Sequence, residues 1–250
     1  MPISEVYNMD CMEYIKDIPD KFFDLAIVDP PYGLNVANMA YTREENRPCR
    51  QKNGNSIIIR RGKYTNKDWD KNTPSKDYFD NLFRVSKNQI IWGINYMPIH
   101  LTGGRIIWDK CNGDNDFSDC EIAYCSHHET IKLFRFMWAG MMQGKSSKDG
   151  HVQQGNKKLN EKRIHPTQKP VILYKWLLEK YANPEGKILD THLGSGSSRI
   201  AAYKLGFDFY ATEIDKEYFD AQEERFRREC FGEEKLSNGQ VAKQLSIFDL

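Results

Sequence analysis

The first candidate for chemistry is the tetrapeptide Asp29-Pro30-Pro31-Tyr32, which follows the apolar run Leu25–Val28. Its two prolines have no backbone N–H and stiffen the turn, so the carbonyl groups before them have no local donor. The turn offers a carboxylate, a bare carbonyl oxygen and an aromatic ring. Two acceptors and a ring predict a site for a planar amino group on an aromatic ring. The amino group donates its two N–H groups to the acceptors, and the ring that bears it stacks on Tyr32. An ordinary strand-terminating turn is the alternative that four residues leave open.

A second set of residues is typical of a nucleotide-like cofactor. The apolar run Lys187–Leu189 leads into Asp190, and Gly194-Ser195-Gly196 then open a predicted helix. Glycines between a strand and a helix let a ligand approach the backbone closely. Glu213 ends the next apolar run, about 20 residues later, where an acidic side chain binds ribose hydroxyls. Because Arg199 stands where a dinucleotide-binding loop needs its third glycine, the pattern favours S-adenosylmethionine (SAM) over NAD.

A third motif is His165-Pro166-Thr167-Gln168-Lys169-Pro170, directly before a helix that we predict to start at Val171. Pro170 suits the first turn of that helix because proline lacks the N–H that a helix start leaves unpaired. Two prolines around Thr167 and Lys169 make a rigid polar turn. Taken alone, this turn leaves a plain helix entrance open as the alternative.

The elements that position these motifs alternate between strands and helices. Apolar and β-branched runs predict strands over 24–28, 89–92, 105–108, 121–125, 131–138, 187–189 and 207–213. Helical periodicity predicts helices over 11–18, 75–85, 171–181, 197–204 and 216–228. This alternation predicts an α/β domain with a mostly parallel sheet. We expect one domain over residues 1–230 and a flexible tail over 231–250.

Charge is unevenly distributed along the chain. Residues 35–76 hold ten Lys/Arg against four Asp/Glu, and residues 143–169 hold seven against two. These segments carry +6 and +5, so the remainder carries −10 to reach the net charge of +1. Both segments are polar and lack apolar periodicity, so we predict that they are loops. Basic loops on an acidic body predict a surface for a polyanion, with solvated lysines as the alternative.

Composition excludes several classes of protein. With 40% hydrophobic and 28% charged residues, the 250-residue chain is typical of a globular domain. No apolar run approaches the roughly 18 residues of a membrane span, and the first residues show no secretory signal. Six cysteines without a paired framework fit a reducing cytoplasm, where we expect the protein. Cys120, Cys125, His127 and His128 lack the usual ligand spacing of a zinc site, so we predict no metal.

Taken together and in this order, the three motifs resemble those of the beta-class DNA amino-methyltransferases, and the resemblance covers most of residues 5–228. It implies an α/β, Rossmann-like SAM-dependent methyltransferase fold with a mostly parallel seven-stranded sheet and helices on both faces. It also implies a set of cofactor contacts. Asp10 and Cys11 match the segment that contacts the cofactor adenine, and Glu213 would bind the ribose. The methionine part would be held by Asp190, Gly194, Ser195 and Gly196, and Asp29, Thr167 and Lys169 would lie near the cofactor.

Two departures from the family pattern affect these expectations. The usual Asp-Pro-Phe before the glycine loop is here Asp190-Thr191-His192, and we expect His192 to pack against the methionine part in place of Phe. The stretch from Ile131 to His165, where the family carries its target-recognition region, is short. We therefore expect brief or relaxed sequence recognition.

The resemblance implies methyl transfer to the N6 amino group of adenine in double-stranded DNA. The catalytic residues would be Asp29, Pro30, Pro31 and Tyr32, acting on a base that has left the duplex. Asp29 and the Pro30 carbonyl would accept the two N–H bonds, so that the nitrogen lone pair points at the methyl group. We expect the basic loop to contact DNA through the residues Arg43, Arg47, Arg50, Lys52, Arg60, Arg61 and Lys63.

Several alternatives stay open at this level. The N4-cytosine members of the family more often carry Ser in place of Asp29, so N4-cytosine is the second candidate. An RNA base or protein amide substrate, a DNA-binding protein without catalysis, and an NAD-linked enzyme are the others. The recognition sequence, a restriction partner and the choice between monomer and homodimer are not revealed by the residues.

The C-terminal residues carry a separate motif. Gln244-Leu245-Ser246-Ile247-Phe248 resembles the peptide by which bacterial replication and repair proteins dock on the sliding clamp. A mobile chain end with apolar anchors at Leu245, Ile247 and Phe248 can insert into a groove. The alternative is that these side chains pack on the protein's own surface.

Overall fold

The structure is a computed structural model that describes residues 1–36, 45–50, 56–61, 67–113, 118–139, 142–235 and 240–243, with the backbone alone within 45–50 and 56–61. Its helices are α1 (Cys11–Lys16), α2 (Lys76–Val85), α3 (Val171–Tyr181), α4 (Ser197–Leu205) and α5 (Lys216–Phe231), with the 3₁₀ turns η2 (Ile94–Tyr96) and η3 (Lys157–Leu159). The strands of the main sheet are β1 (Ser4–Tyr7), β2 (Phe23–Val28), β5 (Ser86–Trp92), β6 (Gly104–Asp109), β7 (Cys120–Cys125), β8 (Ile131–Arg135), β11 (Lys187–Asp190) and β12 (Asp208–Thr212). The remaining strands pair two by two: β3 (Glu45–Arg50) with β4 (Ser56–Arg61), β9 (Trp138–Ala139) with β10 (Met142–Gln143), and β13 (Glu233–Lys235) with β14 (Val241–Lys243).

The main sheet has the order β1-β12-β11-β2-β5-β7-β6-β8. Among these strands β7 alone runs antiparallel to its neighbours, so the mostly parallel α/β prediction is confirmed. The sheet has eight strands rather than the seven that we expected. The strand that our prediction did not include is β1, whose four residues are half exposed and carry little apolar signal.

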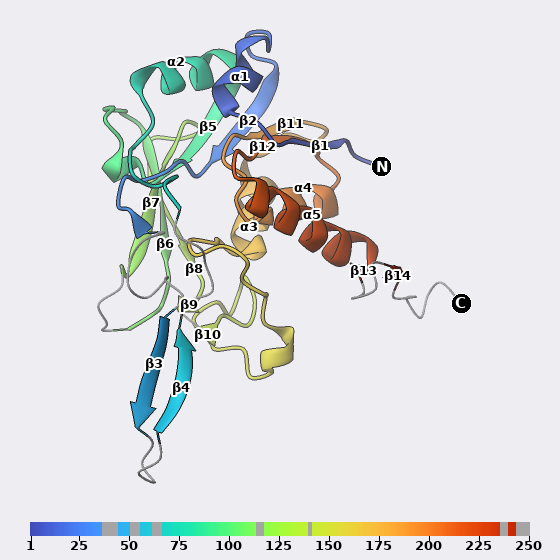
Figure 1. Cartoon of the computed structure of the whole chain (residues 1–250). Helices are drawn as coiled ribbons and strands as arrows, with labels where there is room; N and C mark the ends of the chain where they lie inside the picture. Colours follow the sequence, from blue (N-terminus) through green and yellow to red (C-terminus); the bar gives the residue numbers. More distant parts are fainter. Residues whose placement is uncertain are drawn as a thin grey trace.

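Two hydrophobic cores cover the two faces of this sheet. Leu25 and Ile27 of β2 point into the core beneath α3 and α4, whereas Ala26 and Val28 point into the core beneath α1 and α2. Figure 1 shows α1 and α2 on one side of the sheet and α3, α4 and α5 on the other. Because β2 is buried on both faces, the turn after it starts from a rigid position.

The first basic segment is not the loop that we predicted. The backbone forms an antiparallel hairpin within it, with β3 paired to β4 from Glu45↔Arg61 to Arg50↔Ser56, and this hairpin extends away from the body (Figure 1). The prediction gave weight to charge and missed the β-branched run Ile57–Ile59, which favours a strand. Pro48 is tolerated in β3 because a two-stranded hairpin has only edge strands.

Two further segments differ from the expected elements. The strand predicted over 131–138 divides into β8 and β9. Between them the Phe136 N–H donates to the Asp109 carbonyl, whereas the Met137 N–H donates to the Gly150 carbonyl. The tail predicted from residue 231 begins instead with the end of α5 and the β13–β14 hairpin. The clamp-like peptide 244–248 lies outside the described residues. Within the described part of the chain, no helix is long and apolar enough to cross a membrane.

Candidate active site

Acidic side chains predicted for the site gather at one edge of the sheet. Asp29 follows β2, Asp190 ends β11, and Glu213 follows β12, while Asp10 caps α1 just after β1. These four strands are parallel neighbours, so their carboxyl ends meet at the same edge, where α/β sheets bind their ligands. The structure thereby brings together residues from both ends of the chain.

The glycine loop is held by Glu213. The carboxylate accepts the Gly194 N–H at 2.7 Å through Oε2 and the Asp215 N–H at 2.9 Å through Oε1. Gly194 and Gly196 have positive φ values of 54° and 73°, which L side chains rarely adopt, and this explains the glycines at both positions. Burial raises the pKa of Glu213. Sequence reasoning identified Glu213 and the glycines but not the hydrogen bond between them.

Asp190 is a buried carboxylate whose described partners are all neutral. Its oxygens accept the Ser198 hydroxyl at 2.6 Å and the His192 N–H at 3.1 Å. Burial raises the pKa of Asp190 to about 7, against the lowering effect of these two hydrogen bonds. A buried carboxylate without a cation partner among the described residues is suited to receive a ligand ammonium group.

The residues that follow β1 line the same edge. Asp10 accepts the Met12 N–H at 2.7 Å and so caps α1. The Asn8 side chain donates to the Glu213 carbonyl at 2.7 Å, which ties this segment to the end of β12; sequence reasoning did not predict Asn8. Burial raises the pKa of the Cys11 thiol to about 12, so the thiol stays protonated at physiological pH.

His192 packs edge-on against Tyr78 of α2, with ring centroids 5.4 Å apart. Its Nδ1 lies 2.9 Å from the Thr191 hydroxyl, and that hydroxyl lies 2.6 Å from the Tyr78 hydroxyl. Burial lowers the pKa of His192 to about 4, so the ring is neutral at physiological pH. A neutral ring at this place can replace the Phe that the family usually carries.

The tetrapeptide turn is joined to the third motif by a buried ion pair. The Lys169 ammonium lies 2.6 Å from Asp29 Oδ1 and 3.0 Å from the Tyr32 hydroxyl, which itself donates to Asp29 Oδ1 at 2.7 Å. No described residue hydrogen-bonds Asp29 Oδ2 or the carbonyl oxygen of Pro30. The structure thus places Lys169, which we expected near the cofactor, against the carboxylate of the Asp29–Tyr32 turn.

Glu121 of β7 completes this charged cluster and was not predicted. Its Oε2 lies 2.9 Å from Lys169 Nζ, and its Oε1 lies 2.7 Å from Lys110 Nζ. Burial opposes ionisation, but Lys169 and Lys110 outweigh it and lower the pKa of Glu121 to about 2. Burial also opposes the charge on Lys169, whose pKa the two carboxylates nevertheless raise. For Asp29, burial dominates and raises the pKa, with Lys169 opposing it.

The ring of Tyr32 is closely packed. A Cβ atom at Gly93, whose φ is +64°, would meet the ring at 2.1 Å, so only glycine permits this approach. Tyr96 stacks on the ring with centroids 5.2 Å apart and an interplanar angle of 19°. Burial and the neighbouring Asp29 and Glu121 carboxylates raise the pKa of Tyr32 well above its ordinary value, so the hydroxyl stays neutral.

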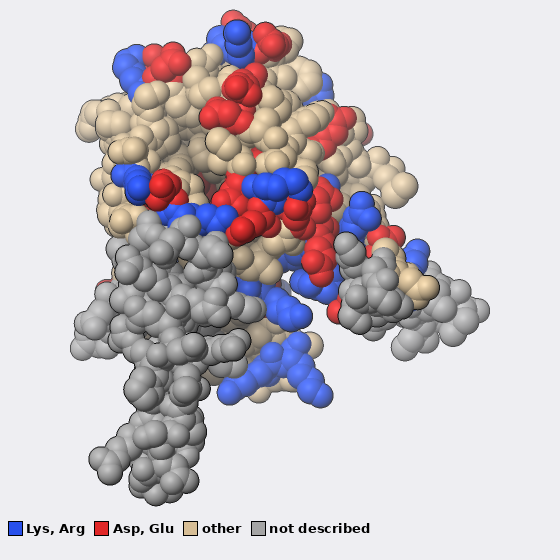
Figure 2. All heavy atoms as spheres, viewed as in Figure 1, with Lys and Arg blue, Asp and Glu red and all other residues tan. Residues whose placement is uncertain are grey.

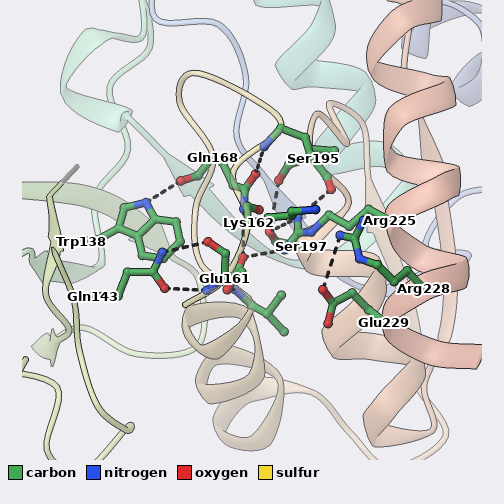
Figure 3. A network of polar contacts seen from close by, with 12 residues as sticks. Trp138, Gln143, Glu161, Lys162, Gln168, Ser195, Ser197, Arg225, Arg228 and Glu229 are labelled. Carbon is green, nitrogen blue, oxygen red and sulfur yellow. Dashed lines mark hydrogen bonds and ion pairs between the residues drawn. The ribbon is translucent and has the colours of Figure 1, made fainter. Parts of the chain in front are cut away.

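The third motif is tied to the glycine loop by the network in Figure 3. Arg225 of α5 is buried and donates to the Ser195 carbonyl at 2.8 Å and to Glu161 at 2.5 Å. Glu161 also accepts the Gln168 amide at 3.0 Å and the Val171 N–H at 3.0 Å. The ring of His165, in turn, accepts the Thr167 N–H at 3.3 Å. The network holds the residues before α3 against the cofactor side of the sheet.

Basic side chains lie on the lobe between β10 and α3. Lys145, Lys148, Lys157, Lys158 and Lys162 are exposed there, and Figure 2 shows Lys and Arg gathered on this part of the molecule. The residues predicted to bind DNA fall outside this description. Arg43, Lys52 and Lys63 lie outside the described residues, and for Arg47, Arg50, Arg60 and Arg61 only the backbone is described.

The cofactor edge fits SAM by the chemistry of its donor set. Asp190 is a buried acceptor with neutral described partners and suits an ammonium group. Glu213 has further lone pairs for ribose hydroxyls beyond the two N–H bonds that it accepts. The glycine backbone between them leaves room for a ligand to approach.

Comparison with known proteins agrees with this geometry. The type II methyltransferase M.BglII of Bacillus subtilis is 26% identical over 244 residues, which cover 87% of this chain and 67% of that protein. M.HinfI of Haemophilus influenzae is 26% identical over 263 residues, covering 90% of this chain and 68% of that protein.

Solved structures show the same fold at lower identity. The M1.HpyAVI–SAM complex matches with a TM-score of 0.51 and 19% identity, over 88% of this chain and 98% of that one. The cytosine-N4-specific PvuII DNA methyltransferase matches with a TM-score of 0.50 and 14% identity, over 90% of this chain and 87% of that one. The family model described as DNA methylase matches residues 23–224, which is most of the chain. The chain therefore belongs to the N6/N4 family of SAM-dependent DNA methylases.

Proposed function

We propose that this protein methylates the N6 amino group of adenine in double-stranded DNA, with Asp29 and Tyr32 holding a base that has left the duplex. The observation that supports the proposal best is the arrangement of the tetrapeptide turn. Asp29 is anchored through Oδ1 to Lys169 and Tyr32, while no described residue hydrogen-bonds its Oδ2 or the Pro30 carbonyl. Among the described residues, both acceptors are therefore left for the two N–H groups of a ligand amino group.

The side chains around the turn have defined tasks in this reaction. Bound SAM supplies the electrophilic methyl group. Asp29 and the Pro30 carbonyl accept the two N–H bonds of the amino group, and this draws the nitrogen toward tetrahedral geometry. Lys169 holds the Asp29 carboxylate in place and favours its ionised form, which is the stronger acceptor. Tyr32 stays neutral and keeps its ring beside the turn.

The cofactor is proposed to bind along the carboxyl ends of β1, β12 and β11. Asp190 would hold the methionine ammonium group, and Glu213 would hold the ribose. Asp10 and Cys11 would line the adenine, with Thr167 and His192 contributing walls. The glycines at 194 and 196 would allow the close approach of the methionine part.

A direct test identifies the methylated base. The purified protein is incubated with methyl-labelled SAM and unmethylated duplex DNA, and the digested nucleosides are analysed by mass spectrometry. We expect N6-methyladenine. N4-methylcytosine would replace the proposal by its cytosine alternative, and retained DNA binding without any product would favour a non-catalytic protein. Parallel reactions with RNA and protein distinguish the remaining substrates.

The contacts with DNA are proposed to lie on the two basic segments. Neutralising Arg60, Arg61, Arg47 and Arg50 together should weaken DNA binding and reduce the salt dependence of the affinity, because fewer phosphates are neutralised. An unchanged affinity and salt slope would contradict this assignment. Neutralising the exposed Lys157 and Lys158 of the second basic segment, residues 143–169, gives a second variant whose DNA affinity and salt slope can be compared with those of the first.

A further inference from the structure

One buried carboxylate outside the three motifs contacts the catalytic turn directly. Asp70 is 3% exposed. Its Oδ1 accepts the Tyr32 N–H at 2.9 Å and the Gly33 N–H at 3.1 Å, and its Oδ2 accepts the Val36 N–H at 2.9 Å. The Asp70 carbonyl accepts a fourth N–H, from Asn35, at 2.8 Å. A single residue thus receives four backbone donors of the segment that begins at Tyr32.

These donors matter because of the two prolines before them. Pro30 and Pro31 have no N–H, so Tyr32 and Gly33 carry the first backbone donors after Asp29. This half-buried to exposed segment pairs with no strand of the described sheets, so its first N–H groups take their acceptor from Asp70. The direction of the Tyr32 side chain follows from the placement of its backbone. Hydrogen bonds to a carboxylate are the stronger kind, and three of them on one side chain restrict the turn.

Asp70 is itself held from the cofactor side. The residues Lys67–Asp70, called the strap below, run from the start of α5 to the catalytic turn. Lys67 Nζ lies 2.8 Å from Asp215 Oδ2, at the N-cap of α5, and 2.8 Å from Glu217 Oε2. The Trp69 ring packs on His165 with centroids 5.0 Å apart.

His165 connects the strap to the glycine loop. Its ring packs on Tyr218 with centroids 4.2 Å apart and lies 3.8 Å from the position of a Cβ atom at Gly194. The strap is therefore anchored to elements of the cofactor edge at one end and to the target-base turn at the other. Its backbone has no freedom to move Asp70 away from Tyr32 without breaking these contacts.

We propose that Asp70 is a positioning residue for methyl transfer, which holds the Asp29–Tyr32 turn in its reactive geometry and is itself held by the strap. The inference rests on the proposed function of the turn. Asp70 acts on the reaction through the backbone of Tyr32 and Gly33. Its removal should affect the rate of the chemical step more than the binding of the cofactor, because the residues proposed to bind SAM keep their own contacts.

Three variants test the proposal in the full-length protein. Asp70→Ala removes all three side-chain bonds, and Asp70→Asn keeps the Oδ1 acceptor for Tyr32 and Gly33 but turns an NH₂ group toward the Val36 N–H. Asp68→Asn is the matched control, because Asp68 lies in the same strap, is exposed and pairs only with Lys71 among the described residues. The measurements are the single-turnover rate of methyl transfer at saturating DNA and SAM, the SAM Kd by calorimetry, and the Tm.

The expected result is a graded loss of rate. The single-turnover rate of Asp70→Ala should be about 10- to 100-fold lower than that of the wild type, because small displacements of a reactive group cost this much in rate. The rate of Asp70→Asn should lie between the two. The SAM Kd should stay within about twofold in both, and Asp68→Asn should match the wild type throughout. A wild-type rate in Asp70→Ala, or a SAM affinity that falls as much as the rate, overturns the proposal. If Asp70→Ala does not fold, the Asp70→Asn comparison decides.

A readout without substrate separates this inference from the proposed function. Amide hydrogen exchange of the peptide that contains Tyr32, Gly33 and Val36 should be slow in the wild type and faster in Asp70→Ala. Equal exchange in both overturns the inference whatever the enzyme methylates. The opposite outcome is a wild-type protein that transfers no methyl group, although amide exchange is faster in Asp70→Ala than in the wild type. That result refutes the proposed function but supports the role of Asp70 in holding the turn.

Discussion

The cofactor edge and the target-base cluster are built in different ways. At the cofactor edge, Glu213 and Asp190 hold backbone N–H groups of residues close to their own strands, and their described partners are uncharged. In the target-base cluster, Asp29, Lys169 and Glu121 form a buried network of full charges from three distant parts of the chain. The first arrangement leaves carboxylates that are suited to a cationic ligand. With Lys110, which pairs with Glu121, the second is already charge-balanced before any base arrives.

This difference assigns separate tasks to the two regions. A carboxylate that lacks a cation gains most from a charged cofactor, so the cofactor edge should control affinity. The Asp29 carboxylate is already paired with Lys169, so a charged ligand would stabilise it little. Its proposed task is to position the amino group, so the cluster should control the rate of methyl transfer. Variants in the two regions should therefore separate into binding defects and rate defects.

The largest effect should come from Asp29→Ala. The variant loses the acceptor proposed to hold the amino group, so methyl transfer should fall on the order of 10³-fold or more, while SAM still binds. Transfer is followed by incorporation of labelled methyl groups into DNA, and SAM binding by calorimetry. Asp24→Asn is a control on the same strand, because Asp24 pairs with Lys87 far from the turn. If SAM affinity fell as much as the rate, Asp29 would have to be assigned to cofactor binding instead of to the target base.

Removing the Lys169 ammonium group, which lies between Asp29 and Glu121, should have the next largest effect. Lys169→Met leaves Asp29 and Glu121 as buried carboxylates without their shared partner, and breaking such a pair costs about 3–5 kcal/mol of stability. Because Lys169 lowers the pKa of Asp29 against the effect of burial, its loss should raise that pKa further. The acid limb of the rate profile should then move to higher pH.

Two companion variants sharpen this result. Lys169→Arg keeps the positive charge and should keep the acid limb near its wild-type position. The double variant Lys169→Met with Glu121→Gln removes one of the two carboxylates and should recover part of the lost Tm. If Lys169→Met has a wild-type pH profile, Lys169 has no part in keeping Asp29 ionised.

At the cofactor edge, Glu213→Ala should raise the SAM Kd. The loss of ribose contacts and of the Gly194 anchor is worth about 1–3 kcal/mol, or roughly 5- to 150-fold in Kd. The rate at saturating SAM should change much less than in Asp29→Ala. Glu224→Ala is the comparison on α5, since Glu224 is on the same helix as the glycine-loop contacts of Arg225 but is not among the residues proposed to bind SAM. Unchanged SAM affinity in Glu213→Ala would show that the ribose binds elsewhere.

The two regions also differ in how well the sequence predicts them. The cofactor edge was predicted because Asp190, Gly194 and Glu213 lie in a local strand–turn–helix pattern, and the described geometry brings them together. In the target-base cluster Asp29 and Tyr32 were predicted, but Glu121 and Asp70 were not. The place of Glu121 depends on how β7 pairs with β5 and β6, and no short pattern encodes that pairing.

Some weaker signals were nevertheless present. Glu121 is a charged residue inside an otherwise apolar strand, and Asp70 follows Trp69 within a segment that is mostly basic. Both are residue types that stand out from their surroundings and needed a structural reason. The β3–β4 hairpin was missed because charge was weighted above the β-branched run in β4. Charge patterns indicate which surface binds a polyanion but carry little information on backbone conformation.

SAM affinity should depend on pH through Asp190. In the free protein burial raises the pKa of Asp190 to about 7, so below pH 7 the carboxyl group must lose its proton before it pairs with an ammonium group. The SAM Kd should therefore rise by up to about tenfold per pH unit below pH 7. Calorimetry at pH 6 and pH 8 measures the change. Equal Kd values would contradict the assignment, and Asp190→Asn should bind weakly with a flatter dependence.

The same shift has an effect on stability with a defined sign. The folded state holds the Asp190 proton more tightly than the unfolded state, so this stabilisation is present below about pH 4 and is lost as pH rises through 7. At pH 8 Asp190→Asn should consequently have a higher Tm than the wild type. At pH 4 the two Tm values should approach each other. A lower Tm of the variant at pH 8 would show that the ionised carboxylate is stabilised by a partner in the free protein.

The smallest effect on catalysis is expected for deletion of residues 244–250, which include no residue predicted to bind the cofactor or the target base. If the clamp-like peptide docks on a sliding clamp, the deletion should leave methylation of a short duplex unchanged and remove clamp binding in a pull-down. Methylation in the presence of clamp-loaded DNA should then slow, because the tether raises the local concentration of enzyme at its substrate. Replacing Leu245 and Phe248 by Ala, with the chain length kept, should reproduce the deletion. A fall of several degrees in Tm would instead mean that these side chains pack on the protein itself, and the tether would be excluded.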